Sequence, residues 1–225
     1  ILAAVLCSAA FLRFYRLDAQ SFWNDEGNSA RIAERSLDLI VEGAAGDIHP
    51  PGYYLLLHGW RALFGQSEFA LRSLSVAAGL VLVAFTCLLA CHLFGRRVGL
   101  VAAALSAVSP FAVYYSQEAR MYALLGALCA ASTYLAFRAF EGIERAPRDG
   151  DGRRALPVWI LLSYVLASAA GLYTHYAFVF ILVAHNVAFG FRWLAEAVRS
   201  RRRWWGPVIW AGAQMGAVML YLPWL

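Results

Sequence analysis

Long stretches without a single Asp, Glu or Arg constrain the fold of this chain more than any other feature. A transmembrane helix needs about 20 consecutive, predominantly apolar residues. The run at 155–191 is too long for one crossing, and its polar and aromatic middle, GLYTHY at 171–176, predicts two helices that meet at a tight turn. The sequence therefore predicts an all-α, polytopic membrane protein with about seven transmembrane helices, over residues 1–12, 73–91, 98–117, 121–137, 155–191 (two helices) and 204–225.

The composition excludes several other classes of protein. With 61% hydrophobic and only 15% charged residues, the chain is unlike a soluble domain, a coiled coil or a disordered segment. A net charge of +5 could suit nucleic acid, but the Arg residues lie between apolar runs and do not form a basic face, so we predict no nucleic-acid partner. The chain lacks an initial Met and both ends lie inside apolar runs, so we expect residues 1–225 to be a single module of a longer protein.

The arginines predict the orientation in the membrane. The 13 apolar residues Ile48–Trp60 would reach only about 20 Å as a helix, too short to cross. If this stretch lies flat, the loops at 96–97, 138–154 and 192–203 fall on one side and hold 12 of the 19 Arg, which makes that side cytoplasmic. Residues 13–72 then form the first extracytoplasmic loop, and we expect a multi-pass protein of the plasma membrane with its active face outside.

Two short interfacial helices are predicted in that first loop. One covers Asn28–Glu42, with Asn28 as its cap and Gly43 at its end. The other lies in the Ile48–Trp60 stretch, with Tyr53, Tyr54 and Trp60 as anchors at the membrane interface.

The stretch FWNDEGNSA, residues 22–30, contains the adjacent carboxylates Asp25 and Glu26. Side chains at neighbouring helical positions diverge, so one can face a cavity while the other bonds locally or holds a cation. The alternative is that Asp25 only complements the dipole of the following helix.

The stretch YYSQEARMY, residues 114–122, lies at the outer end of a crossing that Pro110 should kink or weaken. Glu118 and Arg120 are the only charged residues between Arg97 and Arg138. Charges within the membrane are costly and usually face a cavity or each other, which favours a functional role. A turn that merely marks the membrane boundary remains the alternative.

The stretch HPPGYY, residues 49–54, opens the flat helix, and His49 stands just ahead of amides that could bind an anion. Arg72 could supply charge to the same anion, and His175 lies in the outer turn YTHY. The alternatives are a capping His49, an Arg72 that snorkels to the interface and a packed polar turn at His175.

Together these residues resemble the GT-C superfamily of integral-membrane glycosyltransferases. The acidic pair, HPPGYYLLLHGWRALFGQSEFALR at 49–72 and LFGRRVGLVAAALSAVSPFAVYYSQEARMYALL at 93–125 carry the resemblance. The closest branch is related to dolichyl-phosphate-mannose protein mannosyltransferases and bacterial lipid A aminoarabinose transferases.

The resemblance implies a seven-crossing module that transfers a sugar from a polyprenyl phosphate carrier to an acceptor on the outer side of the membrane. Asp25 falls where the family has its first-loop catalytic acid, and Glu118 lies near its second acidic position. His49 stands where the aminoarabinose transferases have a Lys. The implied partners are the lipid bilayer, the polyprenyl-phosphate sugar and a glycan, lipid or protein acceptor.

An inverting displacement needs a carboxylate to take the acceptor's proton and positive charge to receive the phosphate leaving group. We expect Asp25 to be the base, Arg120 with His49 or Arg72 to hold the phosphate, and Glu118 to position the sugar. No cofactor is required by the sequence; a divalent cation, Mg²⁺ or Mn²⁺, would use Asp25 and Glu118. The candidate catalytic residues are Asp25, Glu26 and Glu118, and the candidate substrate-binding residues are His49, Tyr53, Tyr54, Arg72, Gln117, Arg120, Tyr122 and His175.

Two other functions stay open. A transporter or flippase would use membrane charges as a substrate path without breaking a bond, and it would favour discontinuous helices or an inverted repeat. A non-catalytic scaffold would scatter its charges over the loops, whereas here they gather on one outer face with aromatic residues.

Overall fold

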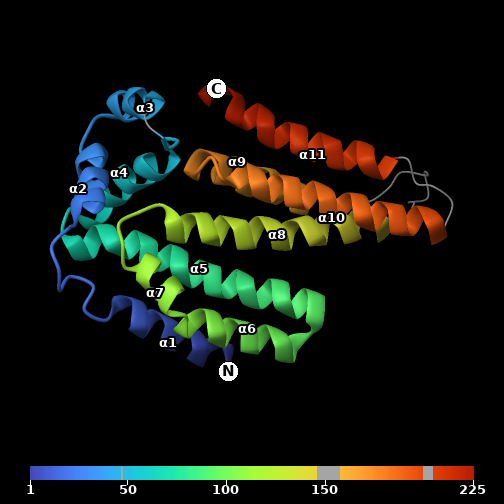
Figure 1. Ribbon diagram of the computed structural model, residues 1–225, viewed down its shortest axis with the longest axis horizontal. Helices are drawn as coiled ribbons and strands as arrows, with labels where there is room; N and C mark the ends of the chain where they lie inside the picture. The colour runs from blue at the N-terminus through green and yellow to red at the C-terminus, as the bar shows by residue number, and fades with distance from the viewer. Residues whose placement is uncertain (47, 146–157, 200–204) are drawn as a thin grey trace. The chain divides into compact units, whose positions relative to one another are not determined.

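The computed structural model describes residues 1–46, 48–145, 158–199 and 205–225, and every regular element in these ranges is a helix (Figure 1). The all-α class is therefore confirmed for the described residues. The helices are α1 Leu2–Phe14, α2 Asn24–Ala33, α3 Leu37–Ala45, α4 Gly52–Phe64, α5 Glu68–Phe94, α6 Arg96–Val108, α7 Pro110–Ser116, α8 Tyr122–Arg145, α9 Val158–Thr174, α10 Phe178–Arg199 and α11 Trp205–Tyr221, followed by a 3₁₀ turn at Leu222–Trp224.

Three of these helices, α5, α8 and α10, are long and apolar enough to cross a membrane. Helices α6 and α7 meet at an angle of 59° and pass the same test together, which gives a fourth candidate span. Helices α1 and α9 are apolar but shorter. The chain is thus a multi-pass membrane protein with three to four candidate spans, and the turn predicted within 155–191 lies between α9 and α10.

The break between α6 and α7 confirms the kink predicted near Pro110. Proline has no amide hydrogen, so the carbonyl four residues earlier, that of Ser106, loses its helical partner. Arg13 of α1 fills the gap: its fully buried guanidinium donates to the carbonyls of Ser106 (3.2 Å) and Ala107 (2.9 Å). Its Nε donates to the Ser116 hydroxyl (3.1 Å), so one side chain holds both halves of the broken helix.

The helices form two compact units. Unit 1 comprises Ile1–Ala130 together with the short turn Tyr173–Tyr176. Its core lies where α4 packs against α2 and α5, and the largest fully buried side chains there include Tyr53, Tyr54, Ile40, Leu57 and Leu71. Residues buried to this degree cannot contact lipid.

Two predictions about the first loop were therefore wrong in detail. Instead of one helix over Asn28–Glu42, the chain forms α2 and α3, because the extended backbone of Ser36 (φ −64°, ψ 156°) ends one helix and caps the next. Tyr53 and Tyr54 are not interfacial anchors, since both are fully buried in the core of unit 1. Trp60 is half-buried, and its indole N–H bonds the Ala70 carbonyl and the Ser73 hydroxyl of α5.

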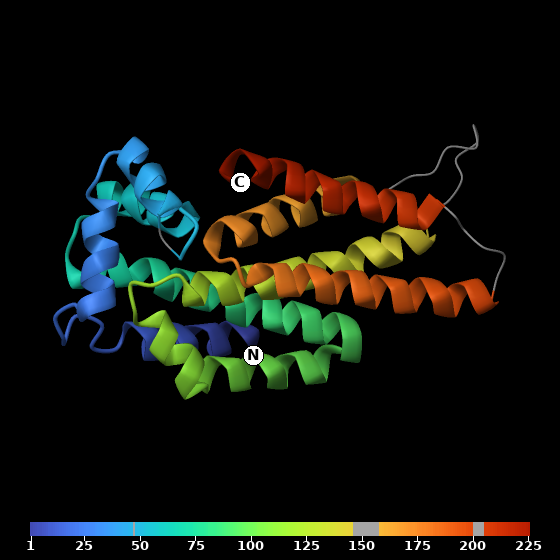
Figure 2. The ribbon, with the colours of Figure 1, turned by 45° about the horizontal axis from the view of Figure 1, so that its top comes forward.

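Unit 2 comprises Ala131–Leu172 and Ala177–Leu225, and its helices run side by side (Figure 2). A buried polar network joins all four of them. The ring of His185 in α10 bonds the Thr133 hydroxyl of α8 (3.0 Å) and the Tyr164 hydroxyl of α9 (3.2 Å). Gln214 of α11 donates to the same Tyr164 oxygen (3.0 Å). The Tyr164 proton is then free for His185 Nδ1, which favours the imidazole tautomer that donates from Nε2.

Candidate active site

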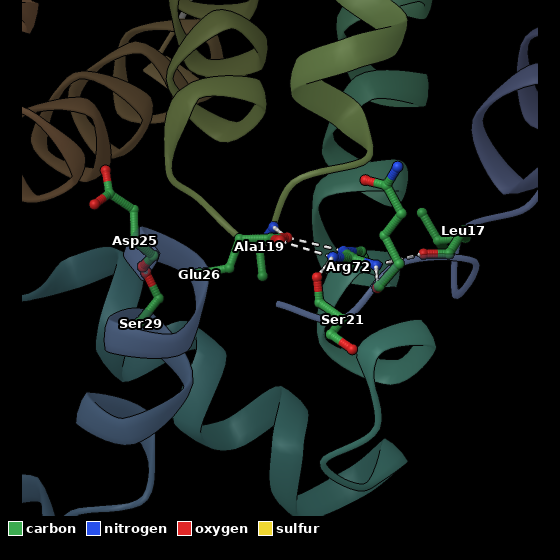
Figure 3. Close-up of polar contacts among 8 residues, drawn as sticks. Leu17, Ser21, Asp25, Glu26, Ser29, Arg72 and Ala119 are labelled. Atoms are coloured by element: carbon green, nitrogen blue, oxygen red, sulfur yellow. Dashed lines mark hydrogen bonds and ion pairs between the residues drawn. The ribbon is translucent and has the colours of Figure 1, made fainter. Parts of the chain in front are cut away.

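The start of α2 separates two neighbouring carboxylates. The helix begins at Asn24, so Asp25 and Glu26 both lie in its first turn, where negative charge is favourable. Because successive helical side chains diverge, Glu26 is buried whereas 45% of the Asp25 side chain is exposed. Figure 3 shows the two carboxylates pointing in different directions. The divergence predicted for this pair is present.

The Glu26 carboxylate forms the most highly connected ion pair of the site (Figure 3). Arg72 of α5 donates to both of its oxygens, from Nε at 2.8 Å and from Nη2 at 2.7 Å, and the backbone amide of Ala119 donates at 2.7 Å. The remaining Arg72 hydrogen bonds go to backbone carbonyls of the first loop, those of Leu17, Gln20 and Ser21. One buried pair thus connects the first loop, α5 and the loop that carries Glu118.

Arg120 contacts Asp25, the more exposed of the two adjacent carboxylates. Its Nη2 lies 3.6 Å from Asp25 Oδ2, and its Nη1 donates to the Asp25 carbonyl (3.4 Å) and the Ser29 hydroxyl (3.3 Å). The guanidinium also lies over the Tyr122 ring, 5.7 Å from its centroid. Arg120 is 5% exposed, yet its Nε has no hydrogen-bond partner in the described part of the chain. A buried donor without an acceptor is costly, and it is suited to a ligand that supplies one.

Glu118 lies two residues before Arg120, in the turn closed by the bond from the Arg120 amide to the Glu118 carbonyl (2.8 Å). Burial raises the pKa of the Glu118 carboxyl above its ordinary value, and the negative charge of Glu26 acts in the same direction. A hydrogen bond from the Tyr114 hydroxyl and the positive charge of Arg120 oppose that rise. Glu118 therefore keeps its proton to a higher pH than an exposed glutamate does.

Two histidines from distant segments meet beside Arg120. The rings of His49 and His175 pack edge to face, with centroids 5.3 Å apart. Burial, together with the positive charge of Arg120, lowers the pKa of His175 and so favours its neutral imidazole. A Cβ on Gly52 would lie 2.5 Å from the Tyr173 carbonyl oxygen, so glycine is what lets the Tyr173–Tyr176 turn pack here.

The other predicted site residues serve the scaffold around these groups. Gln117 donates from Nε2 to three carbonyls at the end of α1, those of Leu12, Arg13 and Tyr15. Tyr53 and Tyr54 pack edge to face beneath the site, and the buried Tyr53 hydroxyl has no hydrogen-bond partner among the described residues. The structure thus brings Asp25, Glu118, Arg120, His49 and His175 to one end of unit 1, whereas the donors of Arg72 and Gln117 are already engaged.

Sequence reasoning missed Ser29 and Gly52. Ser29 accepts from Arg120 and donates to the Asp25 carbonyl (3.0 Å), one helical turn after Asp25. Placing the helix start at Asn28 concealed that spacing, and a start at Asn24 would have revealed it. The sequence carries no sign of the role of Gly52 beyond its place after two prolines. The close approach of the Tyr173 backbone, which is distant in the sequence, leaves no local pattern around Gly52.

A divalent cation was expected to use Asp25 and Glu118. In the part of the chain that the structure describes, no three His, Cys, Asp or Glu side chains are grouped as metal ligands. Asp25 pairs with Arg120, and a neighbouring guanidinium disfavours a cation at the same carboxylate. The divalent cation stays a prediction.

Comparison with known proteins adds one match. A family model described as dolichyl-phosphate-mannose-protein mannosyltransferase matches residues 48–225. The matched range includes His49, Glu118, Arg120 and His175, whereas Asp25 precedes it. No curated protein and no solved structure matches the chain.

Proposed function

This chain belongs to the dolichyl-phosphate-mannose-protein mannosyltransferase family, and on that premise we propose that it transfers a sugar from a polyprenyl phosphate to an acceptor hydroxyl at the Asp25–Arg120 site. Membership places it among membrane glycosyltransferases that use polyprenyl-phosphate sugars. Inversion at the anomeric carbon of the sugar and the roles of the individual residues are parts of the proposal.

In the proposed reaction, the acceptor oxygen attacks the anomeric carbon from the face opposite the phosphate. Its proton passes to the Asp25 carboxylate as the new carbon–oxygen bond forms. The bond from the anomeric carbon to the phosphate oxygen breaks, and its electrons leave on the polyprenyl phosphate. Arg120 stabilises the charge that develops on that leaving group.

The observation that carries this proposal is the pairing of the half-exposed Asp25 carboxylate with the buried Arg120 guanidinium, one of whose N–H donors has no hydrogen-bond partner among the described residues. Arg120 Nε has no acceptor of its own, and a phosphate oxygen would supply one through a charge-assisted hydrogen bond. His175 lies close enough to Arg120 for the charge of Arg120 to lower the pKa of its imidazole, and His49 packs against His175, so we assign both rings to the surroundings of the same phosphate.

Arg72 and Glu26 take a different role in the proposal from the one expected from the sequence. Since all the donors of Arg72 are engaged, we assign the pair to positioning: it holds α2 so that Asp25 faces Arg120. Glu118, with its raised pKa, is proposed to bind a hydroxyl of the donor sugar.

The proposal places the site on the extracytoplasmic side of the plasma membrane. Seven crossings, formed by α1, α5, the bent pair α6–α7, α8, α9, α10 and α11, would put the Arg-rich loops at 96–97, 138–154 and 192–203 on the cytoplasmic side. The site loops would then open on the opposite face.

The test compares Asp25→Asn and Arg120→Gln with Asp38→Asn, an exposed first-loop carboxylate as control. The complete membrane protein in proteoliposomes is given radiolabelled polyprenyl-phosphate sugars, and both the glycoside and the released polyprenyl phosphate are measured. Loss of a general base lowers kcat by about 10²–10⁴-fold, so Asp25→Asn should do so with little change in donor KM. Arg120→Gln should raise donor KM and lower kcat.

Asp25→Asn with more than a tenth of the wild-type kcat would exclude the proposed base. Movement of intact donor across the bilayer without release of polyprenyl phosphate would instead favour a transporter. Addition of EDTA, and then of Mg²⁺ or Mn²⁺, in the same assay tests the predicted cation.

A further inference from the structure

A second recess lies on the side of Asp25 that Arg120 leaves open. It is a pocket of about 370 Å³ along the first half of α2, lined by Phe22, Trp23, Asn24, Asp25, Gly27, Asn28 and Arg31. Arg120 approaches Asp25 at Oδ2, and Oδ1 has no partner in the described part of the chain. In Figure 3 the Asp25 carboxylate points away from the Glu26–Arg72 pair. The proposed base therefore borders a pocket that the donor phosphate site does not use.

The walls of this pocket carry exposed polar groups, both hydrogen-bond donors and acceptors. Asn24, Asn28 and Arg31 follow one another at helical spacings of four and three residues, so they share one face of α2. Their side chains have no polar partner among the described residues. Each amide offers a donor and an acceptor, and the guanidinium offers further donors. This mixture suits hydroxyl groups, which also donate and accept.

The remaining features of the pocket favour a sugar ring. The Trp23 side chain is 48% exposed and gives the wall an aromatic surface, against which the apolar C–H face of a sugar can pack. One Asp and one Arg line the pocket, so their charges balance and a neutral ligand suits it. The volume falls at the lower end of the range for small-molecule sites, about 300–1,000 Å³.

We propose that this pocket is the acceptor site and that its ligand is a neutral, polyhydroxylated sugar unit of a glycan. This inference rests on the proposed function. The acceptor hydroxyl gives its proton to Asp25 Oδ1 and bonds the anomeric carbon, while the bond from that carbon to phosphate breaks on the Arg120 side.

Gly27 offers a way to block the pocket without disturbing the fold. A Cβ built on Gly27 meets no atom within 4 Å, so a larger side chain there enters open space. Gly27→Leu should fill the pocket, and Gly27→Ala is the matched control because it adds a single methyl group. Arg31→Ala removes a donor, and Arg35→Ala, two residues beyond the end of α2 and outside the pocket, is its control.

The experiment uses the complete protein in proteoliposomes with a labelled polyprenyl-phosphate sugar and two acceptor probes, methyl α-mannoside and a Ser/Thr-containing peptide. We expect transfer to the glycoside, with its KM raised at least tenfold by Arg31→Ala and by Gly27→Leu. The KM of the donor should change less than twofold in these variants. Arg35→Ala should leave both constants within twofold of the wild type, and Gly27→Ala should raise the glycoside KM by less than Gly27→Leu does. Saturation-transfer NMR of methyl α-mannoside should show binding to wild type and not to Gly27→Leu.

Glycoside KM values unchanged in Arg31→Ala and Gly27→Leu would overturn the acceptor site. Transfer to the peptide but not to the glycoside would overturn the sugar class. If wild type cleaves no donor, the proposed function fails; the NMR comparison still decides the pocket, since equal binding to wild type and Gly27→Leu would overturn it.

Discussion

At the scale of residues, two carboxylates with the same chemistry occupy opposite environments because they are consecutive in a helix. Glu26 is buried and accepts three hydrogen bonds, whereas Asp25 is half-exposed and keeps one oxygen unpaired. A shift of α2 by one residue would exchange these roles. The buried Glu26–Arg72 pair opposes such a shift, since breaking a buried pair costs roughly 3–5 kcal/mol.

The acid side of the pH profile should depend on Tyr114. Tyr114→Phe removes a hydrogen bond that lowers the pKa of Glu118, so that pKa rises further. If ionised Glu118 binds the donor sugar, activity is present above its pKa and is lost as pH falls through it. We therefore expect the acid limb of kcat/KM to move to higher pH in Tyr114→Phe, with the plateau unchanged within twofold.

The measurement is transfer rate against pH, with Tyr15→Phe, an exposed tyrosine at the end of α1, as control. An acid limb that stays in place, or that moves to lower pH, would contradict this role for Glu118.

How far single residues could be predicted depends on how local their partners are. The sequence could single out Arg120 as a candidate because charge in an apolar setting is costly, and Asp25 because it is one of two adjacent carboxylates. The partners of Arg72 could not be foreseen, since Glu26 lies 46 positions earlier and the other acceptors are backbone carbonyls of an irregular loop. Only the folded chain shows that its donors are engaged.

At the scale of elements, the contact between α4 and the Tyr173–Tyr176 turn depends on one missing side chain. Gly52→Ala would place a methyl group against the Tyr173 carbonyl, and overpacking of this kind costs about 1–3 kcal/mol. We expect a lower Tm and a higher donor KM, because His175 would be displaced. Thermal unfolding in detergent and the transfer assay measure the two effects.

Gly59 on the same helix is the matched control. Its Cβ position is open, so Gly59→Ala should raise stability by about 0.5–1 kcal/mol through helix propensity alone. Equal effects of the two substitutions would mean that the Tyr173 contact does not matter.

The buried network of unit 2 gives a second prediction at this scale. His185→Ala removes two hydrogen bonds that join three helices, and intramembrane bonds average about 0.6 kcal/mol each. We expect unit 2 to lose roughly 1–2 kcal/mol, visible as a lower Tm, with Val187→Ala on the exposed side of α10 losing less. A Tm for His185→Ala no lower than that of Val187→Ala would show that the network is energetically neutral.

Local rules predicted some elements well and others poorly. The kink at Pro110 and the turn between α9 and α10 follow from proline geometry and from chain length, and both are present. The helices of the first loop were harder to predict. The chain breaks at Ser36 between two amphipathic helices, but the spacing of their apolar residues also fits one continuous helix. Tyr53 and Tyr54 were misplaced because an aromatic residue suits a membrane interface and a protein core equally well.

At the scale of the whole molecule, the distribution of arginine predicts the orientation, which labelling can test. The native cysteines are first replaced by Ala at Cys7, Cys87, Cys91 and Cys129. Ser36→Cys in the first loop should react with a membrane-impermeant maleimide in intact cells. Gly150→Cys in the Arg-rich loop should react only after permeabilisation. The reverse pattern would place the site on the cytoplasmic side.

The sequence could predict that the helices pack together, but it could not predict which helices form each of the two compact units. Helices such as α9 are apolar on almost every side, so polarity does not distinguish a lipid-facing surface from one that packs on protein. The division into two units, with the four-residue turn Tyr173–Tyr176 counted in the first, depends on shape complementarity between distant segments.

Arg13 bonds parts of the chain that are synthesised long after it, so its contacts form late in folding. Its acceptors at Ser106, Ala107 and Ser116 lie 93–103 positions later in the chain. At a ribosomal speed of about 5–20 residues per second, they emerge roughly 5–20 s after Arg13. Until then Arg13 has, of its acceptors in the folded chain, only the Ala9 carbonyl of its own helix (3.2 Å), and its long-range hydrogen bonds form once α6 and α7 arrive.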